Sequence, residues 1–190
     1  MPIMNVHYVA GHIDDGAKAD LATRLTEVLI KMEGGANTHG GRAFAWVIFT
    51  EIARTDFWVG GARDDTFIAT PGPFLVHVTI PEGYMNAGHK SEVHAWVNDA
   101  ILATLHARDA HKSSILVVID EVPEGNWGAA GQTISLESIA DAVGMSKSGG
   151  RFSWVRSYFD AKQRMLSAFD YPHDMGGLPP SMSAQRPGRL

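Results

Sequence analysis

Two stretches of this chain share one pattern: residues 49–61 read FTEIARTDFWVGG and residues 119–131 read IDEVPEGNWGAAG. An acidic residue, an aromatic residue and a final glycine match between them at an offset of 70 positions. The matched pairs are Glu51 with Glu121, Phe57 with Trp127, and Gly61 with Gly131. An internal repeat of this length indicates that the fold is two copies of one supersecondary unit.

The same order of elements precedes each stretch. An apolar strand over residues 3–9 or 74–80 leads to a turn at Gly11 or Gly83. A helical stripe of apolar residues follows the turn. The two stripes are Leu21, Leu25, Val28, Leu29 and Met32, and Val93, Trp96, Val97, Ile101 and Leu105. The expected N-caps are Asp14 or Asp15 in the first half and Asn86 in the second. A second strand over residues 44–52 or 115–122 completes a β-α-β unit in each half.

A strand, a crossover helix and a second strand close into a right-handed parallel pair. The sequence therefore predicts an α/β fold, in which duplicated β-α-β units give a four-stranded sheet with two helices on one face. The expected boundaries are a first unit at 1–62, a linker at 63–72, a second unit at 73–131 and a helical extension with a flexible tail at 132–190. The other face of the sheet still needs burial, and oligomerisation would supply it.

Composition excludes several classes of protein. The 190 residues contain no cysteine, so disulfides and thiolate chemistry are excluded. Residues 1–131 are acidic, which argues against a broad nucleic-acid footprint. No window reaches the length of apolar residues that spans a membrane, and no signal peptide is recognisable, so a cytoplasmic protein without membrane contact is expected.

Pro2 directly precedes the first strand. If Met1 is removed after synthesis, Pro2 carries a free secondary amine held at the end of a sheet. An α-amino group titrates near pH ~8, and desolvation lowers that value further. Such an amine can act as a general base or acid near neutral pH.

Pro2, the repeat, the order of elements and the acidic-aromatic-glycine hairpin together resemble the tautomerase superfamily. The duplicated layout is similar to the fused members typified by cis-3-chloroacrylic acid dehalogenase, and residues 51–61 are similar to the end of 4-oxalocrotonate tautomerase. The resemblance implies a tautomerase/MIF-like fold, a homotrimer, a catalytic Pro2, small 2-oxo, enol or unsaturated carboxylic acids as substrates, and no cofactor. In the tautomerases the proline amine moves a proton from carbon to another atom of the substrate.

The chain departs from the family where substrate-binding arginines are expected. Gly11-His12 and Trp46 stand at two of these positions, and Pro81-Glu82-Gly83-Tyr84 replaces the arginines that open the second repeat of the dehalogenase. The helix histidine of that enzyme aligns with Leu29, and its water-activating glutamate has no clear counterpart near Asn126-Trp127. These departures argue against dehalogenation of the cis-3-chloroacrylate type.

The carboxylate of a substrate needs a cationic partner, and a guanidinium gives the best bidentate match. Arg42 and Arg54 flank the strand that carries Trp46, and His12 is a third candidate cation. An apolar wall would exclude water from the amine. Phe57, Trp46 and Trp127 are its expected members, and Tyr84 could donate a hydrogen bond to an enolate oxygen. Each of these residues could instead serve packing or lie at the surface, and Glu51 and Glu121 are expected to be structural because both halves contain them.

Nine histidines show no HExxH motif or close ligand spacing, so no metal is expected. In the extension, residues 135–143 are typical of a capped helix, and an apolar stripe runs from Phe152 to Phe169. Residues 138–151 resemble a helix-turn-helix only superficially, with Arg151, Arg156, Lys162 and Arg164 as its candidate cations. These basic residues leave a DNA-binding tail as one alternative hypothesis. The missing substrate-binding arginines leave an inactive tautomerase-fold scaffold as another.

Overall fold

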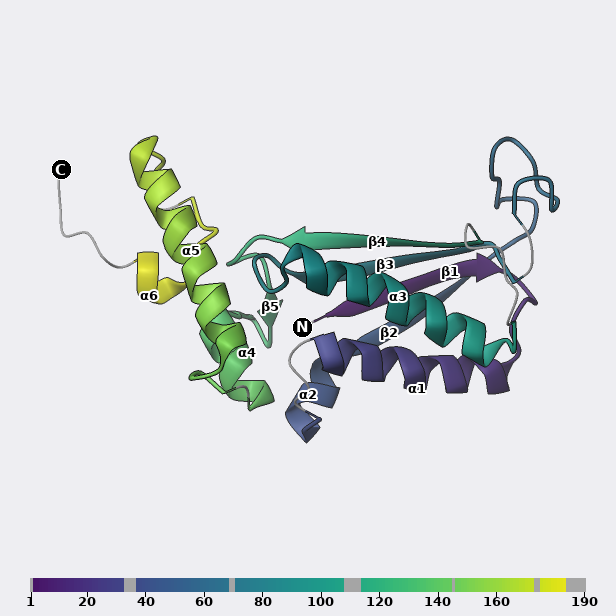
Figure 1. Ribbon diagram of the computed structural model, residues 1–190, viewed down its shortest axis with the longest axis horizontal. Helices are drawn as coiled ribbons and strands as arrows, with labels where there is room; N and C mark the ends of the chain where they lie inside the picture. Colours follow the sequence, from purple (N-terminus) through teal and green to yellow (C-terminus); the bar gives the residue numbers. More distant parts are fainter. Residues whose placement is uncertain are drawn as a thin grey trace.

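The computed structural model describes residues 2–32, 37–68, 71–107, 114–144, 146–172 and 175–183. Four long strands, two long helices and a helical extension make up the described chain (Figure 1). The elements are β1 Ile3–Val9, α1 Asp15–Met32, α2 His39–Phe44, β2 Trp46–Ile52, β3 Phe74–Pro81, α3 Ala87–Thr104, β4 Ile115–Val122, β5 Gly128–Ala129, β6 Gln132–Thr133, α4 Leu136–Val143, α5 Gly150–Ala168 and α6 Pro180–Ser183.

The sheet has the strand order β2-β1-β3-β4. β1 runs parallel to β2, β3 runs parallel to β4, and the two pairs meet where β1 lies antiparallel to β3. The prediction of an α/β fold from two β-α-β units is confirmed. Because the central pairing is antiparallel, the first unit and the second unit point in opposite directions.

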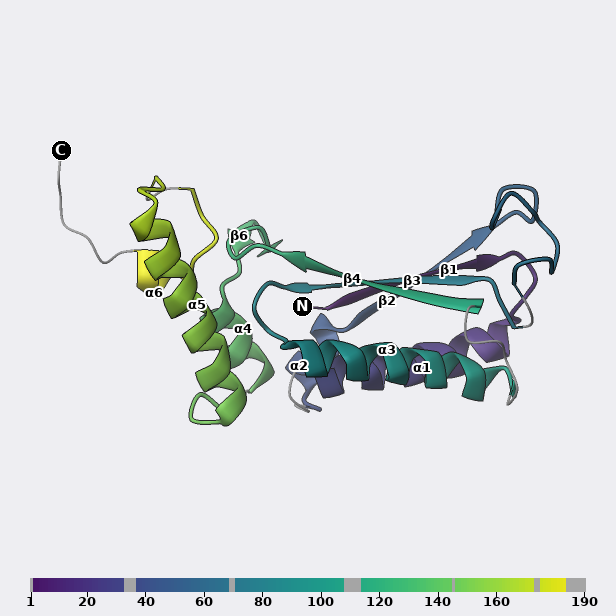
Figure 2. The same cartoon turned by 45° about the horizontal axis from the view of Figure 1, so that its top comes forward.

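The helices α1 and α3 cover the same face of the sheet, as Figure 2 shows. Burial alternates along β1 and β3 because successive side chains point to opposite faces. Met4, Val6, Val76 and Val78 point toward α1 and α3 and are fully buried. The opposite face, which we call the bare face, is covered by no element of the described chain. It presents Trp46 and Ile48 of β2, His7 of β1, His77 of β3 and Leu116 of β4.

Local sequence signals explain the helix starts. The Asp14 carboxylate accepts a hydrogen bond from the Ala17 amide at 2.8 Å, and Asn86 caps α3 through the His89 amide. One predicted boundary was wrong, because the strand expected from residue 44 begins at Trp46. Phe44 ends the short helix α2, whose N-cap is Thr38.

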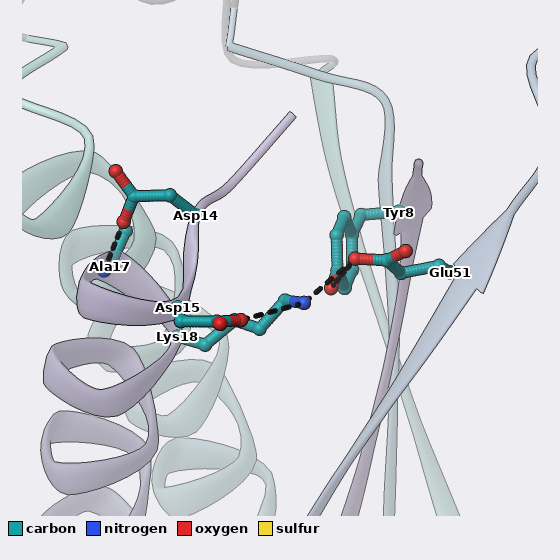
Figure 3. A network of polar contacts seen from close by, with 6 residues as sticks. All are labelled: Tyr8, Asp14, Asp15, Ala17, Lys18 and Glu51. Atoms are coloured by element: carbon teal, nitrogen blue, oxygen red, sulfur yellow. Dashed lines mark hydrogen bonds and ion pairs between the residues drawn. The ribbon is translucent and has the colours of Figure 1, made fainter. Parts of the chain in front are cut away.

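The repeat is visible in matching turns and matching ion pairs. Gly11 and Gly83 both adopt left-handed backbone angles, with φ of +79° and +77°. Lys18 of α1 binds the Glu51 carboxylate at 2.8 Å, and Tyr8 donates to the same oxygen at 2.9 Å (Figure 3). In the second half Lys90 of α3 binds Glu121 at 2.7 Å. Both carboxylates thus tie a helix to its strand, which fits a structural role for each.

The extension packs against the end of the sheet that carries Pro2 (Figure 1). The capped helix expected over residues 135–143 is α4, and Ser135 caps it in a capping box with Ser138. Only the first half of the predicted α5 stripe is buried, at Phe152, Val155 and Phe159, whereas Phe169 is exposed.

Residues 175–183, which belong to the flexible tail expected from the sequence, form hydrogen bonds with earlier parts of the chain. Gly177 donates to the Glu124 carbonyl at 2.9 Å, and Gln163 of α5 donates to the Met182 carbonyl at 2.9 Å. This segment therefore folds back on its own chain. Residues 173–174 and 184–190 of the expected tail lie outside the described residues.

Gly83 and Gly11 form a matched pair for testing how the extension docks. A Cβ at Gly83 would lie 2.4 Å from the Tyr158 ring, whereas a Cβ at Gly11 would meet nothing within 4 Å. Gly11→Ala is expected to cost only the left-handed backbone penalty of roughly 1–2 kcal/mol. Gly83→Ala is expected to lower the free energy of unfolding by more than Gly11→Ala does, because the new Cβ clashes with the Tyr158 ring. It is also expected to make α5 more susceptible to protease. Denaturant unfolding and limited proteolysis measure both effects, and equal behaviour of the two variants would contradict this packing.

Candidate functional site

Pro2 is buried at the start of β1. Its carbonyl accepts a hydrogen bond from the Trp46 amide at 3.2 Å, which fixes its backbone beside the start of β2. Proline has no backbone N–H, so its nitrogen takes no part in the ladder. Met1 lies outside the described residues.

Four of the other predicted site residues lie at the Pro2 end of the sheet. Arg42 and Trp46 belong to α2 and the start of β2, and Tyr84 and Trp127 follow the ends of β3 and β4. Ile3 pairs with Trp46 on one side and with Thr79 on the other, so β2 and β3 flank Pro2.

These four side chains differ in exposure. Trp46 is 51% exposed on the bare face, and Arg42 is exposed with its Nε donating to Asn37 at 2.8 Å. Tyr84 and Trp127 are 5% and 8% exposed. The Trp127 indole N–H is buried and has no hydrogen-bond partner among the described residues. An accessible guanidinium and aromatic walls are therefore both available at this end.

The remaining three predicted residues lie at the opposite end of the sheet. His12 follows the end of β1, and Arg54 and Phe57 follow the end of β2. β1 has seven residues, and at about 3.3 Å each they span roughly 20 Å. One chain by itself therefore does not bring His12, Arg54 or Phe57 to Pro2.

His12 lies in a partly buried environment beside Arg54. Burial, and secondly the positive charge of Arg54, lower the pKa of His12 below its usual value, while Asp65 acts in the opposite direction. The neutral imidazole is favoured, so Arg54 rather than His12 supplies positive charge at this position.

Sequence reasoning missed an acidic cluster that holds the extension to the Pro2 end. Glu82 accepts a hydrogen bond from the Tyr158 hydroxyl and pairs with Lys162, and both donors belong to α5. Glu124 is 2% exposed and accepts a hydrogen bond from the Leu136 amide at 2.7 Å. Burial raises the pKa of Glu124 above its usual value. No sequence signal separates these carboxylates from surface ones, because their partners are 12 or more residues away.

The structure also bears on functions other than tautomerisation. Lys162, one candidate cation of the helix-turn-helix hypothesis, is engaged by Glu82 rather than free for phosphates. Within the described ranges no cluster of three His, Cys, Asp or Glu side chains could hold a metal ion. In the described part of the chain, no helix combines the length and apolar character needed to cross a membrane.

Comparisons with known proteins agree with this architecture. The family model described as Tautomerase enzyme matches residues 74–137, which contain the second unit. No curated protein is a significant match. Among solved structures, a native fused 4-OT is 26% identical with a TM-score of 0.56, over 69% of this chain and 94% of its own. Further fused 4-OT structures were solved as symmetric and asymmetric trimers.

Two more distant structures extend the likeness of fold. A member of the cis-3-chloroacrylic acid dehalogenase family is 19% identical with a TM-score of 0.58, over 87% of this chain and 99% of its own. That share exceeds the two β-α-β units, so the likeness of fold reaches into the helical extension. The macrophage migration inhibitory factor of Toxoplasma gondii is 14% identical with a TM-score of 0.53, over 70% of this chain and 99% of its own.

The fold thus defines an α/β protein of two fused β-α-β units with the tautomerase/MIF-like architecture. The predicted resemblance to the tautomerase superfamily is confirmed: the Tautomerase enzyme family model matches the second unit, and fused 4-OT and cis-3-chloroacrylic acid dehalogenase family structures share the fold.

The environment of His12 can be tested by titration. Its imidazole is expected to titrate below the ordinary value of ~6.5, and Arg54→Gln is expected to raise the pKa without restoring it fully, because burial remains. Since the unfolded histidine takes up its proton first, this residue makes the folded state less stable as pH falls through ~6.5. NMR of the histidine ring protons measures the pKa. A value at or above the ordinary one would contradict the buried, Arg54-facing position.

Proposed function

We propose that this protein is an enzyme in which Pro2, after removal of Met1, moves a proton on a small 2-oxo, enol or unsaturated carboxylic acid. A keto-enol tautomerase or a related isomerase or hydratase fits this description. The observation that carries the proposal is the position of Pro2, buried at the end of a sheet between β2 and β3. The family match supports it.

The chemistry follows from a desolvated secondary amine. Burial disfavours the protonated form, so a neutral amine is available as a base near neutral pH. It removes a proton from carbon or from an enol oxygen, and the electron pair moves into the conjugated system. The protonated amine then returns the proton to another atom of the same substrate, so proline is regenerated and no cofactor is required.

Arg42 is the proposed partner of the substrate carboxylate. Its Nε donates to Asn37, which leaves its terminal N–H groups for a ligand. Trp46, Tyr84 and the Trp127 side chain, with its unpaired indole N–H, would border the substrate and limit access of water.

Adding one glycine between Met1 and Pro2 tests the amine directly, because the nitrogen of Pro2 becomes an amide that cannot accept a proton. Turnover of phenylenolpyruvate or 2-hydroxymuconate is expected to fall at least ~100-fold. Pro2→Ala, which keeps a primary amine, should retain more activity. Intact mass spectrometry must first show that Met1 is absent from the unmodified protein.

The competing hypothesis is an inactive tautomerase-fold scaffold. The presence of Trp46 and Glu82 at family arginine positions favours it, and Glu82 is bound by Tyr158 and Lys162. A retained Met1, or equal turnover with and without the added glycine, would exclude Pro2 as the catalyst. Turnover no faster than the uncatalysed reaction in both proteins would leave the scaffold.

We also propose that the protein forms a homotrimer through the bare face of its sheet. Leu116 and Ile48 are 60% and 43% exposed there, and the relatives solved as trimers support the proposal. Burying such a face is the remaining way for a two-layer unit to remove apolar surface from water.

A charge on the bare face should break the trimer. Leu116→Lys is expected to reduce the mass measured by light scattering from three chains toward one. Phe169→Lys is the control, because Phe169 is 74% exposed on the extension and lies off the sheet. A wild-type mass of one chain, or a trimer insensitive to Leu116→Lys, would exclude this interface.

A further inference from the structure

We propose that the end of the sheet opposite Pro2 is a second site, which binds a small carboxylate without turning it over. Arg54, His12 and the residues around them form this far-end site. The proposal goes beyond the proposed function and does not depend on the amine of Pro2.

The repeat relates the two ends of the sheet. Gly11 corresponds to Gly83 and Lys18 to Lys90, both at an offset of 72, and the turns and ion pairs of these residues match. At the same offset, the counterpart of Pro2 is Phe74. Phe74 lies inside the chain, so its nitrogen is an amide. The far end therefore repeats the place of the Pro2 site without its proton-transfer group.

An open cleft of about 290 Å³ exists at this end. A volume of this size is at the lower limit for small-molecule sites and suits a compact organic acid. The described lining residues are His12, Arg54, Asp65, Pro71, Gly72, Leu105 and Ala107. Arg54 also lines an adjoining hollow with Phe57, Val59 and Ile68, so apolar surface borders the guanidinium.

Arg54 is available for a carboxylate. Its Nη1 donates to the Arg63 carbonyl at 3.1 Å, and no carboxylate of the described residues forms an ion pair with it. The remaining N–H groups of a guanidinium match a carboxylate in bidentate geometry. His12 adds a second polar group, because its Nδ1 is buried and has no hydrogen-bond partner among the described residues. A ligand oxygen that reached it would satisfy a group that is costly to leave unpaired.

The two ends have diverged in accessibility. At the hairpin offset of 70, the counterpart of Arg54 is Glu124, and the counterpart of Phe57 is Trp127. Glu124 and Trp127 are buried, and Glu124 is held by the Leu136 amide of the extension. At the far end the same positions are an exposed arginine and a half-buried phenylalanine. At the far end the exposed Arg54 therefore faces solvent, whereas at the Pro2 end the corresponding residue, Glu124, is buried.

Asp65 decides between kinds of carboxylate. It lines the same cleft, and its charge is felt by His12. A simple carboxylate or a 2-oxo acid has no positive group to place near Asp65, whereas an α-amino acid could place its ammonium group there. Acetate, pyruvate and alanine distinguish these cases, because the three compounds share a carboxylate and differ in the group beside it.

The test follows the ring signals of His12 by NMR while each of the three compounds is titrated into the full chain. A saturable shift is expected with at least one of them, both in the unmodified protein and in the protein with a glycine before Pro2. Arg54→Gln should weaken this binding at least about tenfold. Arg24→Gln is the matched control, because Arg24 is an exposed arginine of α1 paired with Asp20.

Three results would overturn the proposal. The first is the absence of any saturable shift, and the second is binding that Arg54→Gln leaves unchanged. The third is a loss of turnover in Arg54→Gln, which would assign Arg54 to the Pro2 site of a neighbouring protomer. If the protein with a glycine before Pro2 loses turnover but keeps the ligand-induced shift of His12, the far-end site is supported. The failure of one proposal is thus distinct from the failure of the other.

Discussion

The antiparallel pairing of β1 with β3 is the constraint on which the rest of the structure depends. It joins two parallel β-α-β units into one sheet and turns them in opposite directions. The start of each unit therefore lies beside the turn and hairpin of the other. Pro2 of the first unit is placed at the end where Tyr84 and Trp127 of the second unit lie, and Arg54 and Phe57 are placed at the end where the second unit begins.

The helical extension makes these two related ends different. α5 docks through Tyr158 and Lys162 on Glu82, α4 begins at the amide that Glu124 binds, and the segment after α5 returns to the Glu124 carbonyl. α4 also approaches α2 closely, since a Cβ at Gly40 would lie 2.2 Å from the Ala142 carbonyl oxygen. The Pro2 end is bordered by buried groups as a result, while Arg54 stays accessible at the far end.

A second consequence of this arrangement is that the described chain buries only one face of the sheet. The helices α1 and α3 bury one face of the sheet completely around Val6 and Val76. Exposed Leu116, Ile48 and Trp46 remain on the other face, together with the hydrogen-bonded pair of His77 and Asp120. Apolar exposure of this kind on a small sheet is resolved most simply by further copies of the same chain.

The sequence by itself determined the repeat, the order of elements and the class of fold. Strand alternation, helical stripes and the caps Asp14 and Asn86 are local signals, so β1, α1, α3 and β4 were predicted nearly to the residue. The start of β2 was predicted two residues too early, because Phe44 is apolar and is compatible with either the end of α2 or the start of β2. The resemblance to the fused tautomerases was also recognisable from the sequence, because Pro2 and the repeated acidic-aromatic-glycine pattern are local features.

Only the tertiary structure decided which candidate site residues share a place. Sequence separation does not show to which end of a sheet a loop returns. The length of β1 separates His12, Arg54 and Phe57 from Pro2, although all four belong to one β-α-β unit. The antiparallel junction places Tyr84 and Trp127 of the second unit at the Pro2 end instead. The partners of Glu82 and Glu124 lie in an extension whose docking position no local pattern encodes. Long-range packing, rather than residue type, assigned each arginine, aromatic and carboxylate to its end of the sheet.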